Sequence, residues 1–204
     1  MAADKNERIL TTKEKIFIEA VKLFSDGGYS EVSVRDIAST AGINVSSLYF
    51  HYSSKEEILN LFYDYYMENW KKSAPDLDEL LKLAETAPID EIFKKMDFRF
   101  DPAIRDTMNR IVKIAIRQMA ICPHSEKFIQ EFFLNGCSAP LIKILEKLTE
   151  LGKIEPIDIN AVVCLISRFA VSAAMFQGTA LQVNQNEWRS GLDMAFSLIK
   201  PTGK

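Results

Sequence analysis

Hydrophobic residues recur at the helical spacing of three and four positions along most of the chain. Glycine and proline residues interrupt this pattern, and the intervals between them are too long for strands. No stretch of five or more residues alternates cleanly between apolar and polar side chains. The pattern therefore predicts an all-α protein of about nine helices.

The first 60 residues contain the sharpest helix signals. Residues that favour the N-cap position precede four predicted helices: Thr11, Ser33, Asn44 and Ser54. Thr11 with Glu14, and Ser54 with Glu57, also have the spacing of a capping box. Gly27-Gly28 and Gly42 end the first two helices, because glycine adopts the left-handed conformation at little cost.

Beyond Pro75 the predicted helices become longer. We expect them at 77–86, 89–98, 102–121, 125–151, 158–182 and 186–199. The resulting organisation is an N-terminal arm (1–10), a three-helix domain (11–53), a connecting helix (54–72) and a larger helical domain (73–204).

Two of the short helices form a helix-turn-helix pattern around Gly42. Four apolar residues are expected to pack the two helices together: Ile37, Ala38, Ile43 and Leu48. The opposite side of the third helix then presents Ser46, Ser47, Tyr49 and Phe50 to solvent. Small residues at the start of a recognition helix allow close approach to base edges in the major groove of DNA.

The run from Gly42 to Leu59, together with Ala20 to Ala38, resembles the signature of the TetR/AcrR (tetracycline-repressor-like) family. Tyr52 departs from that signature, where the family more often has Phe, so its hydroxyl needs a partner or an exposed edge. The resemblance implies a ligand-responsive transcriptional regulator, a repressor that binds a pseudo-palindromic operator as a homodimer. A small, mostly apolar effector would release it.

By the same resemblance, the DNA-binding positions would be Ser33, Arg35, Asn44, Val45, Ser46, Ser47, Tyr49, Phe50, His51 and Lys55. Among them Ser33, Arg35, His51 and Lys55 would contact phosphates. The first 60 residues hold seven Lys or Arg against nine Asp or Glu, so no broad basic patch is expected. We therefore expect weak non-specific binding and a modest salt dependence.

In the larger domain, the resemblance suggests an apolar effector pocket. Its candidate lining residues are Phe93, Met96, Phe100, Met108, Arg117, Met119, Phe128, Phe132, Arg168, Phe169, Phe176 and Gln177. Arg168 interrupts an apolar helix, and a buried arginine needs an acidic partner or an anionic ligand. The effector is therefore expected to be mostly apolar, with an acidic group as one option.

The stretch from Ala161 to Met175 is apolar nearly all round, so it must be covered on more than one side. A second copy of the chain is the expected cover. The candidate dimer residues are Val162, Ile166, Phe169, Ala173, Ala174, Trp188, Leu192 and Phe196.

Other functional classes lack support in the sequence. Three widely spaced cysteines and two histidines give neither a disulfide framework nor a protein metal site, and no cofactor motif is present. No nucleophile with a matching base is evident, so we do not expect an enzyme. The polar start is unlike a secretory signal, and we expect a cytoplasmic protein. The alternative is an all-α protein-interaction module or small enzyme with a fortuitous helix-turn-helix.

Overall fold

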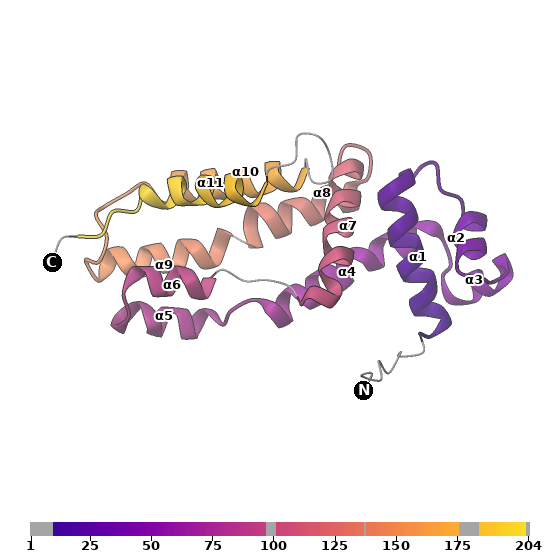
Figure 1. The fold of residues 1–204 in the computed structure, drawn as a ribbon, viewed down its shortest axis with the longest axis horizontal. Helices are drawn as coiled ribbons and strands as arrows, with labels where there is room; N and C mark the ends of the chain where they lie inside the picture. Colours follow the sequence, from indigo (N-terminus) through magenta and orange to yellow (C-terminus); the bar gives the residue numbers. More distant parts are fainter. Residues whose placement is uncertain (1–9, 97–100, 137, 176–183, 203–204) are drawn as a thin grey trace, which may run out of the picture.

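Three short helices form one end of an elongated molecule (Figure 1). The computed structural model describes residues 10–96, 101–136, 138–175 and 184–202. The helices α1 (Thr12–Gly27), α2 (Val34–Thr40) and α3 (Val45–His51) make up this end, which we call the head.

The N-caps that fix these helices follow the sequence signals closely. Thr11 Oγ1 accepts a hydrogen bond from the Glu14 amide at 3.2 Å, and the Thr11 amide donates to the Glu14 carboxylate at 2.9 Å. That reciprocal pair is the predicted capping box. The second predicted box is only half formed. Ser54 accepts from the Glu57 amide, but the Glu57 carboxylate accepts from the Ser53 amide instead of the Ser54 amide.

The head is joined to the rest of the molecule by a continuous hydrophobic core. Helix α4 (Lys55–Ser73) leaves the head, and α7 (Pro102–Gln118) packs against both. Helix α8 (Pro123–Ile129) packs against α4 and α7. Buried side chains from the head, from α4 and from α7 and α8 belong to one cluster, which we call the first core. The head is therefore not packed as a separate unit.

Five further helices form a second core at the end opposite the head (Figure 1). They are α5 (Leu77–Thr86), α6 (Ile89–Met96), α9 (Ser138–Glu150), α10 (Ile159–Met175) and α11 (Gln185–Ser197). Leu80, Ile144 and Leu145 are fully buried at its centre. Within the described part of the chain, no helix combines the length and apolarity needed to span a bilayer.

The all-α prediction is confirmed, although the helix count differs. The described residues form eleven α-helices and one π-helical segment, with no strand beyond an isolated bridge between Ile154 and Pro201. The single helix expected over 125–151 is wrong. It is divided into α8, the π-helical segment η1 (Gln130–Gly136) and α9.

Two prolines explain why this long helix is divided. Pro123 lies in the first turn of α8, where its missing amide costs nothing, so the helix begins before residue 125. Pro140 in the interior of a helix would clash with the carbonyl four residues earlier, at Gly136. A new helix therefore begins at Ser138 and places Pro140 in its first turn.

The shared first core leads to a testable expectation. Met108 of α7 is fully buried in it, so Met108→Ala should lower the free energy of unfolding by about 2–5 kcal/mol. Hydrogen exchange should accelerate in α1 and α4 as well as in α7, and not in α5 or α9. The matched change Leu145→Ala, in the second core, should give the opposite distribution. Acceleration confined to α7 in Met108→Ala would contradict a common core.

Candidate nucleic-acid interface

Helix α3 is oriented with one side buried and the other in solvent. Asn44 caps it, with Oδ1 accepting from the Ser47 amide at 2.7 Å. Leu48 is completely buried and fixes the inner side, whereas Tyr49 is 52% and Phe50 85% exposed. Two aromatic rings therefore stand in solvent on a helix whose inner side is locked into the first core.

The turn before α3 sets the angle between α2 and α3. Gly42 has φ of +71°, a left-handed conformation that a residue with a Cβ adopts only with strain. Its amide donates to the Ser39 carbonyl at 3.1 Å, and the Ile43 amide donates to the Ala38 carbonyl at 2.9 Å. These two bonds close α2 and let α3 start at once in a new direction.

Tyr52 anchors the end of α3 against α1. Its ring is buried, and its hydroxyl donates to the Lys13 carbonyl at 3.1 Å. The hydroxyl thus has the partner that the sequence required. Burial, with a smaller contribution from the charge of Glu57, raises the pKa of Tyr52 to about 12, so this bond persists at all ordinary pH values.

Of the remaining positions expected to contact DNA, some have side chains that are at least partly exposed, and others serve as helix caps. Arg35 and Ser46 are exposed, and Val45, Ser47 and His51 are half-buried. Ser33 and Asn44 are exposed but serve as helix caps: the Ser33 hydroxyl donates to Asp36 at 2.6 Å and accepts from the Asp36 amide at 3.2 Å. The His51 ring lies edge-on to Phe50, with centroids 5.3 Å apart.

This geometry agrees with comparisons to known proteins. A family model described as bacterial regulatory proteins, tetR family, matches residues 16–61, which span α1 to the first turns of α4. Residues 16–61 therefore belong to the N-terminal region that the tetR family shares.

Two curated relatives have names that fit this membership. The HTH-type transcriptional regulator YerO of Bacillus subtilis is 27% identical over 121 residues, 59% of this chain and 40% of YerO. The biofilm operon negative transcriptional regulator IcaR of Staphylococcus epidermidis is 38% identical over 65 residues, 28% of this chain and 35% of IcaR. The matches thus span well under two thirds of either relative.

Solved structures extend the likeness of fold along the whole chain. The ketosteroid transcriptional regulator KstR2 of Mycobacterium tuberculosis aligns over 95% of this chain and 97% of its own, with a TM-score of 0.61 and 20% identity. A regulator from Saccharomonospora viridis, solved in complex with choline, aligns over 92% and 96%, with a TM-score of 0.59 and 16% identity. The larger domain therefore shares the fold of these two solved structures.

Lys55 differs from the expectation for a TetR-family phosphate contact. Its ammonium donates to the carbonyls of Tyr29 at 2.6 Å and Val32 at 2.9 Å, and lies 4.1 Å from the centre of the Tyr29 ring. Burial lowers the pKa of Lys55, with a smaller opposing effect from Glu31. The amine is thus directed into the loop between α1 and α2, where these two carbonyls accept its hydrogen bonds. The assignment of Lys55 to DNA contact is therefore corrected to a structural one.

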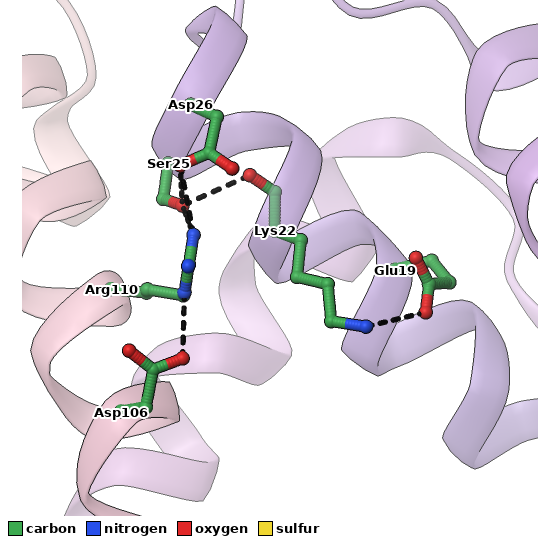
Figure 2. Close-up of polar contacts among 6 residues, drawn as sticks. All are labelled: Glu19, Lys22, Ser25, Asp26, Asp106 and Arg110. Carbon is green, nitrogen blue, oxygen red and sulfur yellow. Dashed lines mark hydrogen bonds and ion pairs between the residues drawn. The ribbon is translucent and has the colours of Figure 1, made fainter.

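The sequence analysis missed the junction between α1 and α7 (Figure 2). Arg110 donates from Nη1 to Ser25 Oγ at 2.7 Å and to Asp26 Oδ1 at 2.8 Å, and from Nε to Asp106 Oδ2 at 2.8 Å. Desolvation raises the pKa of Asp26, but the Ser25 hydrogen bond and the Arg110 charge outweigh it, so this pKa lies below its ordinary value.

Arg117 belongs to the same junction. It is exposed, and its Nη1 donates to the Ser25 carbonyl at 2.8 Å. Helix α1 has no basic residue in its own last turn, so α7 supplies the cation that favours a helix C-terminus. Arg117 is thus directed toward the head, and its assignment to an effector pocket is corrected. No sequence signal links residues 84 to 92 positions apart.

The other candidate pocket residues do not form one group. Met108, Met119, Phe128 and Phe132 lie in the first core, whereas Phe93 and Met96 lie in the second. Phe169 packs against Gly191 of α11. Phe100, Phe176 and Gln177 lie outside the described residues. Arg168 is exposed, so the inference from its burial, including the acidic effector group, loses its basis.

The candidate dimer residues are also divided. Val162 is buried in the second core and the Phe196 ring lies 4.7 Å from that of Phe93, so both face their own protomer. Ile166 and Phe169 are half-buried. The side chains of Ala173, Ala174, Trp188 and Leu192 lie outside the described set. Among the described side chains, large exposed apolar ones are Leu165 on α10, Met194 on α11 and Leu198 at the C-cap of α11.

Two carboxylates in the head predict how its stability depends on pH. Hydrogen bonds from Ser33 hold the pKa of Asp36 below its ordinary 3.8, and those from Ser53 hold the pKa of Glu57 below 4.5. Because the folded chain favours the charged forms, this stabilisation is complete above pH about 4.5 and is lost as pH falls through the folded pKa values. Thermal unfolding from pH 6 to 3 should therefore show a shallower acid loss in Asp36→Asn/Glu57→Gln than in the unaltered protein. Asp78→Asn on α5 is the control, and an equal loss in the double variant would contradict the assignment.

The position of Lys55 gives a second expectation. Lys55→Met removes the ammonium and leaves two carbonyls unpaired, so the free energy of unfolding in urea should fall by about 1–2 kcal/mol. Lys72→Met on the same helix, which breaks only an exposed pair with Glu68, should change it by less than about 0.5 kcal/mol. If Lys55 instead bound a phosphate, Lys55→Met would leave stability unchanged and reduce the salt slope of DNA binding by about 1 per protomer.

Proposed function

We propose that the protein is a homodimeric transcriptional repressor that binds a pseudo-palindromic operator and is released by a small effector. The observation that supports this most is α3, whose inner side is fixed by the buried Leu48 while Tyr49 and Phe50 stand in solvent. A rigid helix with exposed polar and aromatic side chains, placed directly after a tight glycine turn, suits insertion into a major groove.

Contacts to the operator would be divided between bases and backbone. Ser46 and Tyr49 are the exposed groups of α3 available for base edges, and Arg35 is the exposed cation at the start of α2. Lys55 is engaged elsewhere, so few phosphates would be neutralised by each protomer. The expected specificity therefore comes from shape and base contact rather than from bulk charge.

A second copy is the proposed partner for the exposed apolar side of α10 and α11. Leu165, Met194 and Leu198 stand in solvent there, and Cys164 beside Leu165 is also exposed. Large apolar side chains left in solvent on two helices that pack together favour association with a partner. A dimer formed there would need its two α3 helices about 34–36 Å apart to contact successive major grooves on one face of DNA.

The effector would act through the α1–α7 junction. Any shift of α7 in the larger domain must move or break the bonds of Arg110 and Arg117 to the end of α1. A ligand that binds more tightly to one position of α7 would therefore change the spacing of the two heads. The size of the response is limited by that difference in affinity.

The proposal is tested by selecting genomic DNA fragments with the purified full-length protein, followed by gel-shift titration of the enriched sequence. Recovery of a pseudo-palindromic site with half-sites about one helical turn apart is expected. Enrichment of no sequence would remove the proposal and favour a protein-interaction module.

On that operator, Tyr49→Ala should weaken binding by about ten-fold or more, because it removes an exposed ring from the reading side of α3. Its melting temperature should stay close to that of the unaltered protein. Ile121→Ala removes another exposed apolar side chain, between α7 and α8, and should leave operator affinity unchanged. Equal affinities for all three proteins would show that α3 does not face DNA.

A further inference from the structure

A groove of about 200 Å³ lies between α4 and the segment formed by α8 and the start of η1. It lies outside the head and outside the exposed apolar side of α10 and α11. Tyr63 and Phe128 form its inner wall, and His124, Asp64, Lys127 and Glu131 surround its opening. The aromatic wall would bind one part of a ligand, and the charged rim would bind another part of the same ligand.

The aromatic wall is the end of an ordered column of rings. Phe132 stacks on Phe128 at 5.9 Å, Phe128 on Tyr63 at 4.7 Å, and Tyr63 on His124 at 5.7 Å, with interplanar angles of 6°, 17° and 21°. The Tyr63 hydroxyl shares a buried 2.5 Å hydrogen bond with Ser125, which fixes the ring. The first three rings are buried, whereas His124 is exposed and lines the groove, so His124 is the ring of the column that a ligand can reach.

The charges around the opening determine which sign of charge on a ligand is favoured. Asp64 and Glu131 carry two negative charges against one positive charge on Lys127. Lys127 lies 3.6 Å from Glu131, and both side chains are more than 60% exposed, so this ion pair is weak and easily displaced. Aromatic faces also attract cations through their quadrupole. Carboxylates beside stacked rings therefore favour an aromatic cation over a neutral or anionic molecule.

The volume limits the ligand to a small one. An engineered apolar cavity of about 150 Å³ holds one benzene molecule. A groove of about 200 Å³ thus has room for one ring with a short cationic group. We infer that the groove between α4 and α8 binds small aromatic ammonium compounds, with the ring stacked at the His124 end of the column and the cation beside Asp64 and Glu131.

Binding there would connect α4, which carries the head, to α8 in the first core. The inference that such a compound also alters operator affinity rests on the proposed function. The binding site itself does not, because it is tested without DNA.

The test is isothermal titration of the purified full-length protein with benzyltrimethylammonium, benzyl alcohol and phenylacetate. Saturable binding is expected for the cation alone. Asp64→Asn should weaken it by about two- to five-fold, and Lys127→Gln should strengthen it by a similar factor, since each exposed charge contributes a fraction of a kcal/mol to about 1 kcal/mol. His124→Ala should also weaken binding, because it removes the outermost ring.

Glu68→Gln is the matched control. It removes an exposed carboxylate from α4 one turn beyond Asp64, outside the groove, and should leave the affinity unchanged. Absence of saturable binding, equal binding of phenylacetate, or an equal effect of Glu68→Gln and Asp64→Asn would each overturn the site. None of these outcomes bears on operator selection, so failure of the site and failure of the proposed function are distinguishable.

Discussion

The attachment of α1 to α7 is the constraint on which the arrangement of the molecule depends. Two arginines of α7 bind the last turn of α1, through the Ser25 hydroxyl, the Asp26 carboxylate and the Ser25 carbonyl. Beneath these polar bonds the same two helices bury apolar side chains in the first core. The polar bonds fix the direction of α1 relative to α7, and the apolar packing supplies most of the free energy that holds the two helices together. The head therefore has one orientation relative to α7. Under the proposed function, this makes α7 the element through which an effector in the larger domain would influence the head.

Within the head, the side chains that hold α3 and the loop before α2 are directed inward, and two aromatic rings of α3 are directed outward. Leu48 and Tyr52 fix α3 from below, and Lys55 ties down the loop that precedes α2. The rings of Tyr49 and Phe50 are left in solvent, although exposure of large apolar surface is unfavourable. The other Phe and Tyr rings of the head are covered, with Phe24 and Tyr52 buried and Phe17 and Tyr29 half-buried. A fold that leaves only these two rings largely in solvent within the head has a surface suited to a partner.

The features that the sequence predicted well depend on neighbours three or four residues apart. The caps by Thr11, Ser33 and Asn44 and the turn at Gly42 are of this kind, because their bonds lie within one turn of helix. The bonds of Lys55 and Arg117 connect residues 23 to 92 positions apart, and no local pattern specifies them. Arg168 was expected to be buried because its helix is largely apolar, but it is exposed. A largely apolar helix still has a side that its own core leaves uncovered. The break at Pro140 also follows from a local rule, because proline in a helix interior clashes with the carbonyl four residues earlier, and hydrophobic periodicity alone does not show it.

Under the proposed function, the engagement of Lys55 has a kinetic consequence for the search for an operator. Attraction of basic side chains to any stretch of DNA both speeds encounter and retains a regulator on unrelated sequence. Here the first 60 residues carry more acids than bases, and one of the bases is turned into the protein. For such a head, sliding along DNA speeds encounter only a little, and little of the protein is retained on unrelated sequence. Occupancy of its operator would then be set by copy number and by the quality of the base contacts rather than by competition from the bulk genome.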